Sequence, residues 1–248
     1  MIVGYQNKGL RVGNKMVGSA FSGIAKADGK IALKDIKPTG YLELEDLTEG
    51  EGCTGNEFQI VILKANGGND AIYSWIHECI DGEWQGEGFW EGPDADTKEF
   101  NVGQGLWFYS DFDEASLTTA GEALVDARNM PLRIGNTPIS IPLARAVKLT
   151  EIKMVGYETL EDLTGAEGCT GNEFQIVVLK ANGGNDAIYS WIHECIDEEW
   201  QGEGYWEGPE VETKSFEVGD GLWVYSDFDT TDTEDGIYLS FPGLDADE

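Results

Sequence analysis

The chain has 248 residues, with 47 Asp and Glu against 16 Lys and Arg, which gives a formal net charge of −31 at pH 7. Nucleic acid phosphates and anionic membranes repel such a polyanion, so we expect neither as a partner. Hydrophobic residues at 41% and aromatic residues at 11% are enough for packed cores, which argues against disorder. The negative charge has two equally good explanations: it keeps the protein soluble, or it attracts a cation or a protein with a basic surface.

The first residues of the chain lack the apolar core of a signal peptide, and no window approaches the roughly 20 apolar residues of a membrane span. The sequence therefore predicts synthesis in the cytoplasm without a signal peptide, with a place in a virion or another extracellular particle after release.

The sequence is an internal duplication. Residues 40–113 and 156–229 align without a gap, and 60 of the 74 positions are identical. Leu10–Asn14 recurs as Leu132–Asn136, with six more residues in the first copy before the gapless block begins. Every candidate site is therefore present twice. We predict two domains, residues 1–126 and 127–248, joined by a short segment that favours packing of one domain against the other.

Strand patterns follow one another along each copy. Phe58–Leu63 and Ala71–Ile76 flank a turn of Asn and Gly, which predicts a β-hairpin. Phe100–Val102, Leu106–Ser110 and Ser116–Val125 have the pattern of further strands, and no stretch has sustained helical periodicity. We predict an all-β fold of two tandem homologous antiparallel β-sandwich or barrel domains, with six to nine strands each.

Cysteine and histidine occupy equivalent places in the copies: Cys53, His77 and Cys79 in the first, and Cys169, His193 and Cys195 in the second. A disulfide in each copy would stabilise the domain by roughly 3–4 kcal/mol. Free thiols are a second interpretation. A zinc site is a third, because His77 and Cys79 share one face of a strand.

Calcium is the other candidate metal. The segments Glu43–Glu57, Asp111–Glu114 and Asp227–Asp235 supply carboxylate oxygens in turns, which calcium prefers. None has the spacing of an established calcium loop, so solvated acidic turns are the preferred interpretation and no cofactor is required.

The eight tryptophans divide evenly between the copies. Trp75 and Trp107 fall within strand patterns, and we expect them in the core. The segment Glu83–Pro93 is polar and Gly-rich, and we expect a loop there. Its aromatic residues and those of its copy form a candidate sugar-stacking surface or a plug for the end of the sandwich: Trp84, Phe89, Trp90, Trp200, Tyr205 and Trp206.

Motifs of known catalytic sites are lacking: the sequence has no nucleophile elbow, no P-loop and no dinucleotide fingerprint. Carboxylate pairs are the raw material of a glycosidase, but two complete active sites in one small chain would be unusual. We predict that the protein is not an enzyme.

The pattern of Asp35-Ile36, Gly40-Tyr41, Tyr73-Ser-Trp75 and Gly103-Gln-Gly-Leu-Trp107 resembles a repeat domain of gut-bacterial and phage proteins. The second copy repeats the pattern, with Glu151 in place of the aspartate. The resemblance implies virion structural or surface proteins without catalytic residues. We therefore expect a non-catalytic structural or assembly protein, such as a phage head-decoration component, that binds other protein subunits. The alternative is a bivalent carbohydrate-binding module whose partners are glycans.

Overall fold

The computed structural model describes residues 3–19, 21–22, 29–42, 57–64, 68–80, 83–123, 126–158, 173–179, 184–196 and 199–243. The described part of the chain is all-β, with two short 3₁₀ turns, η1 (Leu33–Asp35) and η2 (Leu149–Glu151), and no α-helix. None of its helices is long and apolar enough to cross a membrane.

The first copy contributes eleven strands in these residues: β1 (Val3–Gly9), β2 (Gly13–Val17), β3 (Phe21–Ser22), β4 (Lys30–Ala32), β5 (Ile36–Thr39), β6 (Phe58–Leu63), β7 (Asn69–Ile80), β8 (Glu83–Glu91), β9 (Glu99–Asn101), β10 (Leu106–Ser110) and β11 (Ser116–Ala123). The second copy contributes ten: β12 (Arg128–Pro131), β13 (Gly135–Ser140), β14 (Val147–Lys148), β15 (Lys153–Val155), β16 (Phe174–Leu179), β17 (Asn185–Ile196), β18 (Glu199–Glu207), β19 (Ser215–Phe216), β20 (Gly221–Ser226) and β21 (Tyr238–Phe241). Both totals exceed the six to nine expected, because short pairs such as β4–β9 have too few residues to show a periodic pattern.

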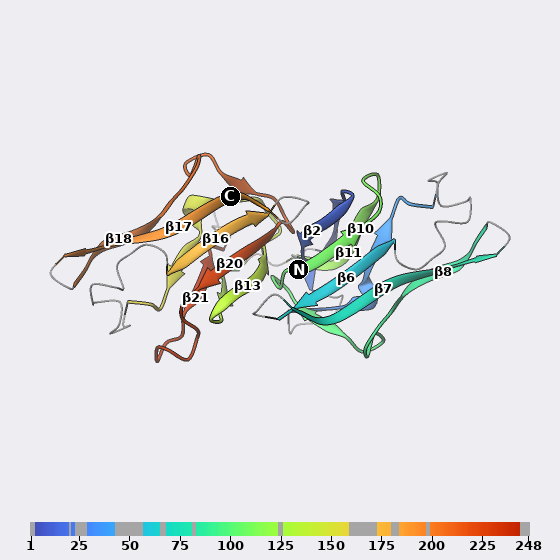
Figure 1. The fold of residues 1–248 in the computed structure, drawn as a ribbon, viewed down its shortest axis with the longest axis horizontal. Helices are drawn as coiled ribbons and strands as arrows, with labels where there is room; N and C mark the ends of the chain where they lie inside the picture. Colours follow the sequence, from blue (N-terminus) through green and yellow to red (C-terminus); the bar gives the residue numbers. More distant parts are fainter. Residues whose placement is uncertain are drawn as a thin grey trace.

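Each copy is an open antiparallel sandwich, which confirms the predicted fold class, although neither copy is a closed barrel. The large sheets have the strand orders β2-β10-β6-β7-β8 and β13-β20-β16-β17-β18. The small sheets are β1-β11-β3, with β5 also paired to β11, and β12-β21-β15. Strand β11 passes behind β10, so the small sheet covers one face of the large sheet (Figure 1).

The predicted hairpin is confirmed: β6 and β7 pair antiparallel, with Ile60 opposite Tyr73. Side chains alternate along β7 as expected, since Tyr73 and Trp75 are buried while Ile72 is 42% exposed. The expected loop at Glu83–Pro93 is wrong, because Glu83–Glu91 forms strand β8, which pairs with β7. The local sequence resembles a loop because it is rich in glycine and charged residues; along the described part of this strand, Glu87, Phe89 and Glu91 are exposed while Trp90 is buried.

Two separate hydrophobic clusters fill the sandwiches. One contains buried residues from Leu10 to Leu117 and the other from Leu132 to Phe241. Inward-facing residues of the large sheet, such as Ile60 and Phe108, meet Leu117 of the small sheet in the first cluster. Each copy thus buries its own core, and contacts between the copies are additional to it.

Candidate binding groove at the junction of the copies

The two copies meet where strands β2 and β13, at the edges of the large sheets, approach each other near the centre of the molecule (Figure 1). Among the described residues, three backbone hydrogen bonds cross this junction: Gly18 N–H to Gly219 O at 3.2 Å, Gly105 N–H to Pro138 O at 3.0 Å, and Ser140 N–H to Gly103 O at 2.7 Å. The isolated bridges Val17–Asp220 and Gln104–Ile139 are equivalent under the repeat. The two copies are therefore related by a pseudo-twofold axis that passes through the junction, as the subunits of a symmetric dimer are.

The Gly-x-Gly-Leu-Trp motif of each copy builds this junction. A Cβ on Gly105 would lie 2.8 Å from the backbone nitrogen of Ile139, and one on Gly221 would lie 1.9 Å from Cγ of Met16. Both atoms belong to the opposite copy, and no Cβ fits at such distances. Glycine is required here because the two backbones approach closely.

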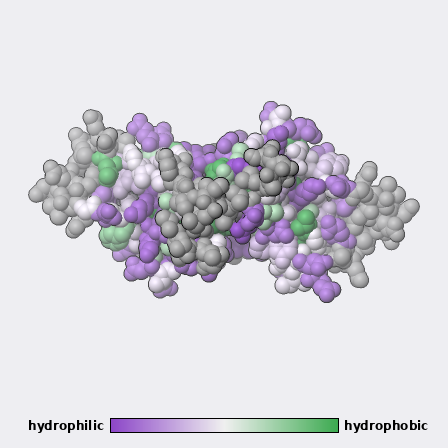
Figure 2. Space-filling model, turned by 180° about the vertical axis from the view of Figure 1, so that it is seen from behind, coloured by the Kyte–Doolittle hydropathy of each residue, from purple (hydrophilic) through white to green (hydrophobic). Residues whose placement is uncertain are grey.

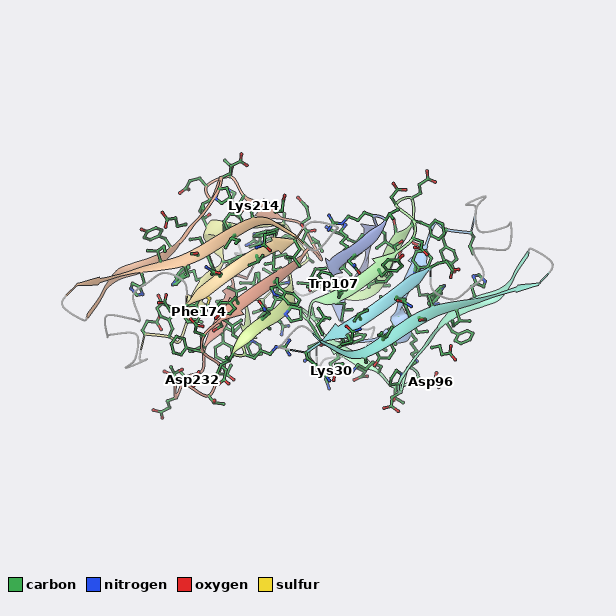
Figure 3. The ribbon with its side chains drawn as sticks, viewed as in Figure 1. Lys30, Asp96, Trp107, Phe174, Lys214 and Asp232 are labelled. Atoms are coloured by element: carbon green, nitrogen blue, oxygen red, sulfur yellow. The ribbon has the colours of Figure 1, made fainter. Side chains whose placement is uncertain are left out.

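Side chains add symmetric contacts. The indole rings of Trp107 and Trp223 meet edge to face, with centroids 6.1 Å apart and planes at 67°. Trp107 lies where the two copies meet (Figure 3).

Two equivalent arginines also cross the junction. Arg133 donates from Nη2 to Leu63 O at 3.4 Å, and its copy Arg11 donates likewise to Leu179 O. Burial lowers the pKa of the Arg133 guanidinium.

One ion pair at the junction has no counterpart. Lys8 Nζ lies 2.6 Å from Oδ1 of Asp220, whereas the position equivalent to Asp220 in the first copy is Gln104. With side-chain exposures of 15% and 32%, the pair is partly screened from water, and we expect it to contribute roughly 1 kcal/mol.

The outer face of each large sheet carries two rows of side chains across the strands. In the first copy the polar row is Asn14, Tyr109, Gln59, Ser74 and Glu91, and the apolar row is Met16, Trp107, Val61 and Ile72. The second copy has the same rows, with Pro138 in place of Met16. The registers thus place amides and aromatic rings side by side on an open sheet face.

These rows meet at the junction in a groove of about 740 Å³. Its lining residues are Asn14, Gln59, Val61, Leu63, Asn69, Trp107, Tyr109, Asn136, Gln175, Val177, Leu179, Asn185, Ile188, Trp223 and Tyr225. The lining draws on equivalent residues of both copies and contains no charged side chain. We call it the junction groove.

Two amides and two phenols of the junction groove are held in place by their neighbours. Gln59 donates from Nε2 to Ser74 Oγ at 3.3 Å, as Gln175 does to Ser190. The Tyr109 hydroxyl donates to Oδ1 of Asp111 at 2.5 Å, and this bond raises the pKa of Tyr109. Tyr225 makes the same contact with Asp227. The groove therefore presents oriented polar groups.

Of the two interpretations of Glu83–Pro93 and its copy, the sugar-stacking surface does not hold for Trp90 and Trp206. Trp90 and Trp206 are only 6% and 4% exposed, and Trp90 Nε1 donates to Ile36 O at 2.6 Å. They are core residues because they sit on the inner face of strands β8 and β18. Phe89 and Tyr205, one position earlier, are each 56% exposed. The side chains of Trp84 and Trp200 lie outside the described residues.

Trp107, expected in the core, lies partly exposed at the junction with its copy Trp223, so that expectation is wrong. Alternation along β10 separates Trp107 and Tyr109 from Leu106 and Phe108, but large hydrophobic or aromatic side chains occupy both sets, so the alternation alone does not tell the inner face from the outer one. The polar row that runs through Gln59 and Ser74 marks the outer face, and this was the signal in the sequence that could have assigned Trp107 to it.

The cysteine expectations fall largely outside the described residues. Cys53 and Cys169 are not among them, and for Cys79 and Cys195 only the strand positions are described, in β7 and β17. Among the described residues, no group of three His, Cys, Asp or Glu side chains is placed to hold a metal ion.

Both histidines occupy hydrogen-bond networks. Trp75 donates from Nε1 to the Tyr41 hydroxyl at 2.8 Å, and that hydroxyl lies 2.9 Å from Nδ1 of His77. His77 Nε2 lies 3.2 Å from Gly86 O. The indole N–H can only donate, so the Tyr41 hydroxyl accepts from Trp75 and donates its own proton to Nδ1 of His77. All three hydrogen bonds then form at once if Nε2–H of His77 donates to Gly86 O. Both ring nitrogens thus have protein partners, at a point where the β7–β8 register shifts.

The second copy repeats the connection from Trp191 through Tyr157 to His193, at 3.0 and 2.5 Å. Burial raises the pKa of Tyr157 to about 12, against the opposing effect of the Trp191 hydrogen bond. The phenol therefore stays neutral and able to donate well into the alkaline range.

The described acidic turns use their carboxylates locally. Asp229 accepts from the Thr231 backbone at 2.7 Å and from its hydroxyl at 2.5 Å, and these bonds lower the pKa of Asp229. Asp232 in turn accepts from the Asp229 backbone at 2.6 Å. Most of Glu43–Glu57 lies outside the described residues.

Comparisons with known proteins add no relative: no family model matches the chain, and no curated protein or solved structure matches it either. The resemblance to a phage and gut-bacterial repeat domain therefore stays a prediction.

Proposed function

We propose that this chain is a non-catalytic assembly protein, a single-chain pseudo-dimer that links two equivalent partners within a larger particle such as a virion. The observation that carries the proposal is the placement of the duplicated ends. The junction uses the Gly-x-Gly-Leu-Trp surface of both copies, and the β7–β8 and β17–β18 hairpins extend from opposite ends of the molecule (Figure 1). One chain thereby offers the same surface twice.

Each hairpin carries one exposed aromatic side chain, Phe89 on β8 and Tyr205 on β18, beside a half-buried isoleucine. Phe89 lies opposite Ile76 across β7 and β8, and Tyr205 lies opposite Ile192 across β17 and β18. Hydrophilic side chains cover most of the described back face of the molecule, so exposed apolar residues are sparse there (Figure 2). Burial of an aromatic side chain in a contact contributes roughly 1.5–3 kcal/mol. Two weak contacts on one rigid chain gain affinity from avidity.

The net charge of −31 opposes the close approach of several chains. Salt or divalent cations screen this repulsion, so assembly should strengthen as ionic strength rises. Both histidines hydrogen-bond through Nδ1 to a buried tyrosine hydroxyl, and His77 also contacts Gly86 O through Nε2, which supports a structural role for these residues.

Light scattering and negative-stain electron microscopy across salt and magnesium concentrations test the proposal. We expect particles or filaments for the natural chain and their loss in the double variant Phe89→Glu and Tyr205→Glu. The matched control is Val12→Glu with Ile134→Glu, because these apolar residues are equally exposed, at 57% and 58%, but lie elsewhere. A chain that stays monomeric under all conditions, or a control pair that disrupts particles equally, contradicts the proposal.

A further inference from the structure

We propose that the junction groove binds an uncharged oligosaccharide that spans both copies. The inference is independent of the assembly role, because it rests on a different surface. Three observations carry it: the lining is free of charge, its polar groups are side-chain amides beside aromatic rings, and the same groups recur on both sides of the pseudo-twofold axis.

The absence of charge is unusual for this protein. A quarter of all residues are charged, yet none of the fifteen lining residues is. The net charge of −31 disfavours the approach of an anionic ligand, and a cationic ligand would meet no carboxylate in the lining. The groove therefore fits an uncharged ligand, and its volume of 740 Å³ lies within the range of about 300–1,000 Å³ that is typical of small-molecule sites.

The polar groups suit hydroxyls. Each carboxamide both donates and accepts hydrogen bonds, as each sugar hydroxyl does. The lining holds six of them: Asn14, Gln59, Asn69, Asn136, Gln175 and Asn185. Gln59 and Gln175 are oriented by Ser74 and Ser190, so little ordering is needed on binding.

The aromatic groups suit the apolar face of a sugar ring. Trp107, Trp223, Tyr109 and Tyr225 are partly exposed in the groove, and the C–H-bearing face of a pyranose packs flat against such rings. Trp107 and Trp223 stand at the axis, where one sugar chain would contact both. Aromatic rings with hydrogen-bonding side chains beside them provide contact area and orientation together.

A peptide fits less well. Extended peptides are recognised mainly through main-chain pairing with the edge of a sheet. At this junction the edge strands β2 and β13 face each other, and the lining consists of side chains on the sheet face. The groove thus offers side-chain chemistry rather than a free sheet edge.

The symmetry adds a specific consequence. A sugar chain has a direction, whereas the groove presents equivalent groups to chains that run either way across its axis. The two halves should therefore contribute equally, so that the loss of Trp107 and the loss of Trp223 weaken binding by the same factor.

Calorimetric titration of the full chain with cellohexaose, maltohexaose, xylohexaose and mannohexaose tests the proposal, with hexagalacturonate and an uncharged Ser/Gly hexapeptide as comparators. We expect binding of at least one neutral hexaose, and a loss of about tenfold or more in affinity for Trp107→Ala and for Trp223→Ala alike. Gln59→Glu, which keeps the side-chain size but adds charge, should also weaken binding.

Leu42→Ala is the matched control, since it removes an apolar side chain that is 50% exposed and lies outside the lining, and it should leave affinity unchanged. Trp107→Phe keeps an aromatic face and should retain most of the affinity, which separates loss of contact from loss of folding. Failure of all four neutral hexaoses to bind overturns the proposal. So does tighter binding of hexagalacturonate or of the peptide, or binding that survives both tryptophan substitutions. None of these results bears on particle assembly.

Discussion

Gly105→Ala should open the junction while leaving both cores intact. The new Cβ would lie 2.8 Å from the backbone N of Ile139 and from the backbone C of Pro138, whereas ordinary contacts of a Cβ are 3.4–4 Å. The strands must therefore separate by roughly half an ångström, because backbone atoms cannot rotate away as a side chain can. The equivalent Gly221→Ala meets Met16 in the same way.

The expected loss in the free energy of unfolding follows from the contacts that are disturbed at the junction. Overpacking costs about 1–3 kcal/mol, and the neighbouring bonds of Gly105 N–H and Ser140 N–H are worth about 1 kcal/mol each. We expect a loss of about 2–4 kcal/mol in the free energy of unfolding. The double variant should lose less than twice as much as either single variant, since both substitutions break the same junction.

Urea unfolding and hydrogen exchange measure this effect. The amides of Gly105 and Ser140 should exchange faster in the variant, whereas the amide of Phe108 in strand β10 should stay protected. Gly9→Ala is the control, because no atom lies within 4 Å of its added Cβ. The reasoning is refuted if Gly105→Ala is as stable as Gly9→Ala and the Ser140 amide remains protected.

Three further predictions concern charge, pH and burial. Between pH 10 and about 12 the unfolded chain loses the Tyr157 proton before the folded chain does, so the free energy of unfolding should fall by roughly 2–3 kcal/mol. Thermal unfolding of Tyr157→Phe should show a smaller decrease over this pH range, and a decrease equal to that of the natural chain contradicts the raised pKa of Tyr157. Lys8→Met should cost about 1 kcal/mol in low salt and less in 1 M salt, and salt-independent urea midpoints would argue against a role for its Asp220 pair. Trp90→Ala should cost about 3–5 kcal/mol and Phe89→Ala under about 0.5 kcal/mol in urea unfolding; similar losses would contradict their assigned burial.

Local patterns predicted much of the fold. Strands β6, β7 and β10 have strong periodicity and β-branched or aromatic residues, and each was expected within a residue or a few of its observed ends. Strand β8 was missed because its Gly-rich, charged sequence has the composition of a loop. Its pairing with β7 supplies the hydrogen bonds that local propensity does not.

The junction groove could not be predicted in the same way. Its lining comes from both copies, and the packing of two sheet edges depends on close backbone approach at Gly105 and Gly221. The sequence pointed to the Gly-x-Gly-Leu-Trp motif, but only the three-dimensional arrangement gives that motif a role. The duplication was expected to create two separate sites, whereas the structure combines both copies in one groove.

The stoichiometry of oligosaccharide binding tests the central claim, that the two copies act as one pseudo-symmetric unit. Calorimetry of the full chain with the neutral hexaose that binds tightest should give one hexaose per chain. Two independent hexaoses per chain, one for each copy, would contradict a shared groove.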